Sequence, residues 1–243
     1  MQIIILAAGK GSRMNSEKPK VMHEIAGRPM LEHVVHNCSQ VTDDLVLVYS
    51  DHLLPYLGQF DNRCKTVRQA EPLGTAHAVW TAKDYFKKEE PIGVIYGDNP
   101  LITSKIITDL FGYLQESNSK IVTLAFDYTK PNHYGRIILD EEGNFLKIVE
   151  SKFATEQELK ISLCNSGIMA FAPGILEKYI DVCITPDKSN SDKELYLTEI
   201  IQICAAAREK VSYFKSLQHQ LVVGVNTQKE LSDANLLYTK NRL

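Results

Sequence analysis

Short apolar runs alternate with segments of helical periodicity through the first half of the chain. The apolar runs are rich in Ile, Val and Leu, and they predict buried strands at residues 2–6, 45–49, 66–68, 93–96 and 121–126. Between these runs the periodicity predicts helices at residues 29–38, 75–86 and 103–115. Alternation of strand and helix is typical of parallel βαβ units, so we expect an α/β fold with an open sheet.

The pattern changes after residue 127. Apolar runs at 136–139 and 145–150 flank a turn-rich acidic segment, which predicts a β-hairpin. Further strands are expected at 163–171, 211–214 and 221–223, and further helices at 173–180, 194–208 and 227–240. Residues 185–193 are polar and predict a long loop. Since no linker rich in Pro, Gly and Ser divides the chain, we expect one domain over residues 1–243.

Composition narrows the class of protein. The 243 residues carry a net charge of -3, so no strong positive field recruits nucleic acid or an anionic membrane surface. No stretch approaches the roughly 20 apolar residues of a membrane span, and the N-terminal apolar run is too short for a secretory signal. Five cysteines with no C-x-x-C pair favour reduced thiols, and hence the cytoplasm, over disulfides or a zinc site.

A glycine-rich loop with the sequence LAAGKGSRM follows the first predicted strand. Small residues let backbone amides approach a polyanion, and successive N–H groups form an anion-binding concavity. Lys10, Arg13 and Lys20 place three cations within eleven residues, where they can neutralise charge on phosphate oxygens. The Walker motif is absent, and Met14 stands where the dinucleotide fingerprint needs its third glycine. The loop composition alone is equally compatible with a solvated strand-to-helix turn.

The loop and the KPK that ends at Lys20 resemble the L-x-x-G-x-G-[ST]-x-M-x4-P-K signature of the sugar-1-phosphate nucleotidyltransferases. Within that family, the chain most resembles the uridylyltransferase domain of the bifunctional bacterial enzymes that make UDP-N-acetylglucosamine. Matching segments follow in order through nearly the whole chain: QAEPLGTAHA (69–78), YGDNPL (96–101), YGRI (134–137), IVE (148–150), NSGI (165–168), YLTE (196–199) and GVN (224–226). The resemblance implies a Rossmann-like (GT-A-like) fold, with a mostly parallel mixed sheet flanked by helices.

The resemblance also implies a role for each matching position. Nucleotide binding, in a part spanning residues 1–126, falls to Leu6, Ala7, Ala8, Gly9, Lys20, Gln69, Gly74 and Thr75. Sugar binding, largely in a part spanning residues 127–226, falls to Tyr96, Gly97, Gly135, Glu150, Asn165 and Thr198. The implied catalytic residues are Arg13 and Lys20, and the implied Mg²⁺ ligands are Asp98 and Asn226. Residues 227–243 form the closing helix.

Residue chemistry supports some of these roles. Asp98 follows an apolar strand, so its carboxylate should emerge at the carboxyl end of the sheet, where open α/β sheets bind ligands. One carboxylate and one amide, completed by phosphates and waters, suit the oxygen preference of Mg²⁺. Gln69 can meet a pyrimidine edge with one donor and one acceptor, and Gly135 allows close approach of the backbone.

Other assignments have a plainer alternative. Taken singly, Asn226 is the cap of the final helix, Gln69 and Glu150 are surface residues at strand ends, Asn165 is a turn former and Tyr96 is a core residue. His33 and His36 are interpreted as two exposed helix histidines rather than metal ligands, and His77 as a packing residue rather than a catalytic base.

The implied reaction converts UTP and N-acetylglucosamine 1-phosphate to UDP-N-acetylglucosamine, a peptidoglycan precursor, and pyrophosphate. The attacking sugar-phosphate oxygen is already an anion, so no side-chain base is required. That agrees with the absence of an obvious carboxylate pair or nucleophile triad. The expected partners are these small molecules, with no nucleic acid and no membrane, and the oligomeric state stays open.

Three alternatives keep the same fold. The acceptor could be another sugar-1-phosphate or a phospho-alcohol, the donor could be another nucleoside triphosphate, or the protein could bind nucleotide sugars without catalysis. The bifunctional relatives continue into a β-helix that carries acetyl transfer and builds a trimer. Because the chain contains no hexapeptide array, the resemblance supports neither of those properties here.

Overall fold

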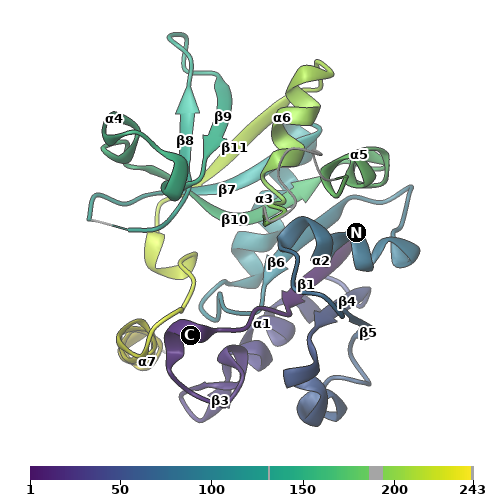
Figure 1. Cartoon of the computed structure of the whole chain (residues 1–243), viewed down its shortest axis with the longest axis vertical. Helices are drawn as coiled ribbons and strands as arrows, with labels where there is room; N and C mark the ends of the chain where they lie inside the picture. The colour runs from purple at the N-terminus through teal and green to yellow at the C-terminus, as the bar shows by residue number, and fades with distance from the viewer. Residues whose placement is uncertain (131, 186–193, 242–243) are drawn as a thin grey trace.

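The computed structural model describes residues 1–130, 132–185 and 194–241 (Figure 1). Within these ranges the main sheet has nine strands. Its path is β11 (Val211–Ser216), β7 (Ile121–Asp127), β10 (Leu163–Phe171), β6 (Ile92–Tyr96), β1 (Gln2–Ala7), β4 (Leu45–Tyr49) and β5 (Lys65–Arg68), and the hairpin of β8 (Arg136–Leu139) and β9 (Phe145–Val149) joins β10. Along the path only β10 runs antiparallel to its neighbours. The expected mostly parallel mixed sheet is therefore confirmed.

Alternate side chains of the central strands enter two separate apolar cores. In β1, Ile3 and Ile5 pack in one core, whereas Ile4 and Leu6 pack in the other. Burial on both faces explains why such strands are continuous apolar runs in the sequence. The first core is completed by α1 (Met30–Ser39) and α3 (Ser104–Glu116), and the second by α2 (Thr75–Thr81), α5 (Ile175–Cys183) and α6 (Glu199–Ala206). Helices thus cover both faces of the sheet.

The last helix, α7 (Gln228–Asn241), returns to the N-terminal part of the chain. In Figure 1 it lies, in yellow, beside the purple segment that follows β1. Its Asn235 side chain accepts a hydrogen bond from Ala26 N and donates one to Glu24 O, which fixes the small hairpin of β2 (Glu24–Ile25) and β3 (Arg28–Pro29).

One consequence of α7 is that the prediction of two exposed histidines is wrong for His33. Its side chain is 3% exposed, its Nε2 lies 2.8 Å from Ile25 O, and its ring packs against Tyr238 of α7. His36 is exposed, as expected. The covering helix lies about two hundred residues away in the sequence, so the periodicity of α1 could not reveal it.

Three expected elements differ from the structure. Residues 221–223 form no strand: a 3-10 helix at His219–Leu221 includes the first of them, the backbone at Leu221 and Val222 makes local hydrogen bonds, and both side chains are buried. The helix expected over residues 75–86 ends at Thr81, and a 3-10 helix at Lys83–Tyr85 follows. The helix expected from residue 194 begins only at Glu199. Of the expected loop at 185–193, residues 186–193 lie outside the described residues.

Several short elements had no periodic signal in the sequence. They comprise the β2–β3 hairpin, the helix α4 (Glu156–Leu159) and 3-10 helices at Ser12–Met14, Lys20–Met22, Asp51–Gln59 and Ser151–Phe153. All five cysteines are free and buried, as expected for reduced thiols. None of the described helices is long and apolar enough to cross a membrane.

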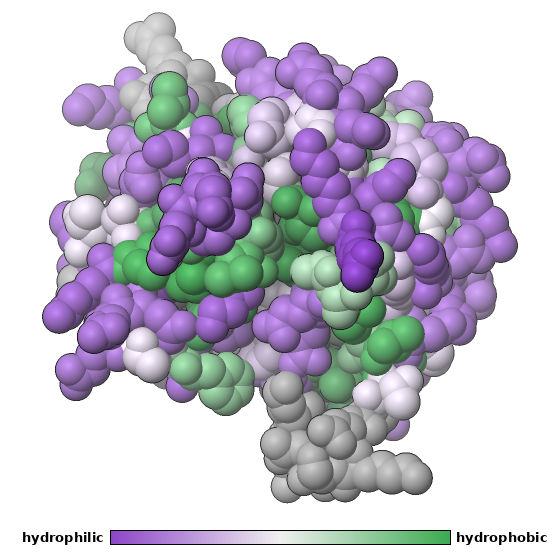
Figure 2. Space-filling view, turned by 90° about the horizontal axis from the view of Figure 1, so that it is seen from above, coloured by the Kyte–Doolittle hydropathy of each residue, from purple (hydrophilic) through white to green (hydrophobic). Residues whose placement is uncertain are grey.

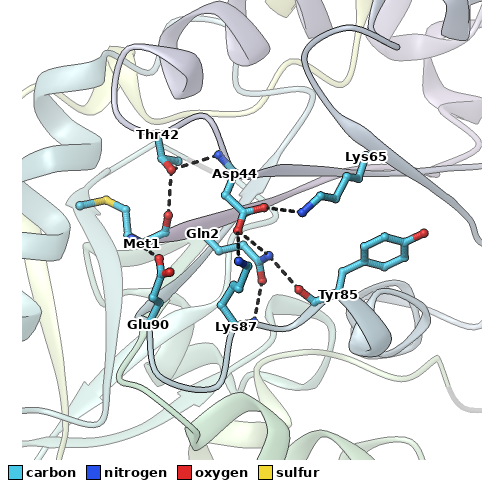
Figure 3. A network of polar contacts seen from close by, with 8 residues as sticks. All are labelled: Met1, Gln2, Thr42, Asp44, Lys65, Tyr85, Lys87 and Glu90. Carbon is cyan, nitrogen blue, oxygen red and sulfur yellow. Dashed lines mark hydrogen bonds and ion pairs between the residues drawn. The ribbon is translucent and has the colours of Figure 1, made fainter.

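A network of polar contacts lies at the amino ends of β1 and β4 (Figure 3). The Met1 ammonium pairs with Glu90 at 2.6 Å, and the fully buried Gln2 donates from its side chain to Asp44 at 3.3 Å. Asp44 also accepts from Lys65 at 3.0 Å. These charges are satisfied within the fold, which leaves the opposite, carboxyl ends of the strands as the place to look for ligand-binding groups.

Candidate active site

The glycine loop leaves the carboxyl end of β1, the strand that lies between β4 and β6. Gly11 has a φ of +63°, and a Cβ placed there would lie 2.5 Å from the Cβ of Lys20. Glycine at this position therefore allows the loop and Lys20 to pack side by side. A Cβ at Gly9 would touch nothing within 4 Å, so the backbone at Gly9 is open to a ligand.

The implied catalytic cations and metal ligands form one cluster beside this loop. Asp98 follows β6, whose end is adjacent to that of β1. The Lys20 ammonium forms an ion pair with the Asp98 carboxylate and donates to Asn226 Oδ1 at 2.9 Å. Arg13 Nη2 donates to the same Asn226 oxygen at 2.9 Å, across 213 positions of sequence. Side chains from three distant segments thus converge on one point.

Asn226 reaches this point through the backbone that precedes α7. Val225 N donates to Asp98 O at 2.8 Å, which pins this segment to the end of β6. The expectation that Asn226 caps the final helix is wrong, because Thr227 Oγ1 accepts from Glu230 N and is the cap. The Asn226 side-chain oxygen is therefore free of helix capping and points to Lys20 and Arg13.

A cleft of about 490 Å³ opens over the glycine loop. All eight expected nucleotide-binding residues line it, namely Leu6, Ala7, Ala8, Gly9, Lys20, Gln69, Gly74 and Thr75. It is also lined by Arg13, expected to be catalytic, by Tyr96, expected on the sugar side, and by Asp98, an expected metal ligand. Lys10 also lines it, as do four residues without an expected role: Val21, Pro72, Ala78 and Glu194. Val21, Pro72 and Ala78 lie within or next to segments that match the family, and nothing else in the sequence indicated that they belong to the site. Glu194 had no signal of its own.

The Gln69 side chain is held by two hydrogen bonds. It is 6% exposed, and its Nε2 donates to Gly74 O at 3.1 Å and lies 3.1 Å from His77 Nδ1. Both amide hydrogens are thereby used, so the expected pairing through one donor and one acceptor is reduced to an acceptor, Oε1. His77 also stacks on Trp80, which agrees with a packing role.

Residues 194–198, here called the bridging segment, lie against the turn at Gly74. Gly74 has a φ of +120°, and a Cβ there would lie 2.4 Å from Leu195 O. Leu195 N donates to Leu73 O, and Leu197 N donates to Thr75 Oγ1 at 2.9 Å. These contacts explain why residues 194–198 are not helical. The segment connects the nucleotide side of the site to the sugar side.

The bridging segment ends at Thr198, whose hydroxyl donates to Glu150 Oε1 at 2.7 Å. Burial raises the pKa of the Glu150 carboxyl, and the hydrogen bond from Thr198 opposes that shift. A Cβ at Gly135 would lie 3.4 Å from Glu150 Oε2, so glycine keeps the space beside this carboxylate open. Glu150, Thr198 and Gly135 therefore form a second cluster of the implied sugar-side residues.

The sugar-side cluster faces a groove of about 340 Å³ between β9 and α6, which Glu150 and Thr198 line. Figure 2 looks onto this end of the molecule and shows apolar side chains gathered in a band among hydrophilic ones. Phe153 and Ile203 contribute apolar surface to the groove. The groove therefore has a mixed lining of polar and apolar side chains.

The remaining sugar-side residues are placed differently. Asn165 is 5% exposed, and its Oδ1 accepts from Thr123 at 2.6 Å and from Gly167 N at 3.0 Å, so that oxygen supports the fold. Gly97 is buried where Val21 and Leu31 pack closely. Tyr96 shares a hydrogen bond with Thr75, and burial raises the pKa of its phenol, which stays neutral. Gly97, Gly135, Asn165 and Asn226 line neither the cleft nor the groove.

The oxygens of Asp98 and Asn226 are suitable for Mg²⁺ but do not form a complete site. They share one cation, the Lys20 ammonium, which shows that both can reach a single point. Among the described residues no group of three or more His, Cys, Asp or Glu side chains could hold a metal. Two protein oxygens completed by phosphates and waters fit the way Mg²⁺ binds in phosphate sites.

Comparisons with known proteins agree with this geometry. The MobA-like NTP transferase domain matches residues 3–159. The bifunctional protein GlmU of Desulfotalea psychrophila is 35% identical over 100% of this chain and 72% of its own length. GlmU proteins of Gluconobacter oxydans and Clostridioides difficile are 37% and 39% identical over 95% of this chain, which spans 50% of each of them.

Two solved structures share the fold. A Bacillus anthracis protein described as a glucose-1-phosphate thymidylyltransferase has a TM-score of 0.73 at 20% identity, covering 98% of this chain and 94% of its own. A CMP:2-keto-3-deoxy-manno-octonic acid synthetase has a TM-score of 0.71 at 17% identity, covering 99% and 98%. The expected resemblance is confirmed by the GlmU relatives. The chain belongs to the nucleotidyltransferases of the MobA-like NTP transferase family and is a relative of the GlmU proteins.

Proposed function

We propose that the protein transfers uridylyl from UTP to N-acetylglucosamine 1-phosphate and releases pyrophosphate. The observation that carries the proposal is the cluster at the glycine loop, where Lys20 and Arg13 meet Asp98 and Asn226. Cations, loop amides and two oxygens suited to a metal, gathered in one cluster, are what phosphoryl-type transfer requires. The similarity to GlmU proteins over nearly the whole chain supports the same reaction.

The proposed mechanism is in-line attack by a sugar-phosphate oxygen on the α-phosphorus of UTP. The nucleophile is an anion, so the chain needs to supply no base and instead positions two polyanions. Lys20, Arg13 and the amides around Gly9 neutralise charge on the phosphates as pyrophosphate leaves. Mg²⁺, held by Asp98 and Asn226, would supply further charge neutralisation.

The preference for uracil rests on Gln69. Because its amide hydrogens are engaged by Gly74 and His77, it offers only Oε1 to a base. Uracil presents the N3–H donor to such an acceptor, whereas cytosine presents an acceptor at N3, which would repel Oε1. We therefore expect UTP to be preferred to CTP.

On the sugar side we propose that Glu150 and Thr198 contact the sugar, with Gly135 leaving room for it. Tyr96, Gly97 and Asn165 complete this side. Asn165 acts through its side-chain NH2 group, because its Oδ1 already accepts from Thr123 and Gly167 N. In this scheme residues 1–243 act as one nucleotidyltransferase domain, and the reaction belongs to cytoplasmic synthesis of peptidoglycan precursors.

The test is pyrophosphate release with four nucleoside triphosphates and a panel of sugar 1-phosphates, with and without Mg²⁺. We expect Mg²⁺-dependent release with UTP and N-acetylglucosamine 1-phosphate, and a loss of orders of magnitude in turnover for Lys20→Ala. Preference for CTP or for a different acceptor would replace the substrate assignment. Near-normal turnover of Lys20→Ala would remove Lys20 from the reaction, and no release with any pair would favour a binding protein.

A further inference from the structure

The Lys20 ammonium stands where the two oxygens assigned to the metal converge. It pairs with the Asp98 carboxylate and donates to Asn226 Oδ1 at 2.9 Å. The side chains of Lys20 and Asp98 are 12% and 15% exposed, so this ion pair is largely shielded from water. A divalent cation could bind these two oxygens only by displacing the ammonium.

Lys20 can release these oxygens without a change of fold. Its backbone begins a 3-10 helix, in which His23 N donates to Lys20 O at 3.2 Å, and its Cβ packs against Gly11. The remainder of the side chain is a flexible stem that carries the ammonium. Lys20 and the glycine loop line the same cleft, so an ammonium that leaves Asp98 stays within reach of phosphates bound there.

We propose that Lys20 is an internal cation that holds Asp98 and Asn226 until nucleotide binding releases it. The proposal rests on the proposed function. Separating an ammonium from a shielded carboxylate is costly unless the ammonium gains another anion. A triphosphate supplies that anion and, at the same time, supplies oxygens to the metal. The metal alone therefore binds weakly, and the metal with nucleotide binds tightly.

The competition also makes the two ligands cooperative. By linkage, metal and nucleotide raise each other's affinity by the same factor. Part of this coupling comes from Lys20, because the nucleotide removes the ammonium that opposes the metal. A neutral side chain at position 20 should therefore raise metal affinity in the absence of nucleotide.

The experiment measures Mn²⁺ binding to the full chain by electron paramagnetic resonance, without nucleotide. Lys20→Met should bind Mn²⁺ at least about tenfold more tightly than the parent, because the bonds that it removes are charge-assisted. Lys10→Met is the matched control, because Lys10 lines the same cleft but has no described bond to Asp98 or Asn226. The gain of Lys20→Met should disappear when Asp98→Asn is added.

Two results would overturn the proposal. One is equal Mn²⁺ affinity of the parent and Lys20→Met, and the other is an equal gain in Lys10→Met, which would indicate a general charge effect. Lys20→Gln serves as a second variant, and circular dichroism checks that each variant is folded. Repeating the titration with α,β-methylene UTP distinguishes a failure of the Lys20 proposal from a failure of the proposed function. If the parent binds no Mn²⁺ in the presence of this nucleotide analogue, the metal site of the proposed function is wrong.

Discussion

Glu150 is the residue whose environment most affects its chemistry. Burial raises the pKa of its carboxyl, while Thr198 donates a hydrogen bond to Oε1 and the nearby Glu194 carboxylate raises the pKa further. A carboxylate is the stronger acceptor for sugar hydroxyls, yet its ionised form is the one that burial disfavours. The site thus gives up some stability to keep a strong acceptor beside Gly135.

Glu150→Gln tests whether the ionised carboxylate lowers stability while it strengthens sugar binding. Because the folded pKa is raised, the stabilisation that Glu150 provides is present at low pH and is lost as pH rises through that pKa. The glutamine variant lacks this loss, so its melting temperature should exceed that of the parent at pH 8, by about 1 to 3 °C, and the difference should shrink towards pH 4. The same variant should raise KM for the sugar phosphate at pH 8.

The control for this measurement is Glu158→Gln in α4. Hydrogen bonds from the backbone and side chain of Thr155 lower the pKa of Glu158, so its contribution is present at neutral pH and is lost on acidification. Its variant should therefore be the less stable one at pH 8. If Glu150→Gln lowers the melting temperature at pH 8, as Glu158→Gln is expected to do, the assigned environment of Glu150 is wrong.

Among the elements, the bridging segment connects the two halves of the site. At one end Leu195 and Leu197 bond to the turn around Gly74 and Thr75, and at the other end Thr198 bonds to Glu150. These contacts lie within four residues of one another and face different partners, and the segment is accordingly neither a regular helix nor a strand. The position of the sugar-side carboxylate thus depends on the nucleotide-side turn.

Gly74→Ala should disturb this segment. The new Cβ would meet the Leu195 backbone at 2.4 Å and would strain a φ of +120°, so we expect a loss of about 2 to 4 kcal/mol in unfolding free energy. KM should rise for both UTP and the sugar phosphate. Thermal unfolding and steady-state kinetics provide the measurements.

Gly112→Ala in α3 is the matched control for that variant. A Cβ there would touch nothing within 4 Å, and alanine favours a helix by about 1 kcal/mol over glycine. It should be neutral or stabilising, with unchanged KM values. A rise in KM for UTP alone in Gly74→Ala would show that the segment does not couple the two sides.

At the scale of the whole molecule, the alternation of the main strands and helices and the place of Asp98 at the carboxyl end of the sheet could be predicted from the sequence. Both follow from local periodicity and from the rule that the carboxyl ends of parallel strands share an edge. Asn226 was indicated only by family resemblance, because its approach depends on a backbone bond between Val225 and Asp98. Burial of His33 and the non-helical course of residues 194–198 depend on contacts with residues far away in the sequence, which local periodicity does not reveal.

The central claim is that the protein joins UTP to a sugar 1-phosphate by direct attack on the α-phosphorus. The most direct measurement follows N-acetylglucosamine 1-phosphate labelled with ¹⁸O in its phosphate, reacted with UTP and Mg²⁺ and analysed by mass spectrometry and ³¹P NMR. We predict UDP-N-acetylglucosamine that retains all of the label, with unlabelled pyrophosphate. Label in pyrophosphate, or no nucleotide sugar at all, would contradict the account.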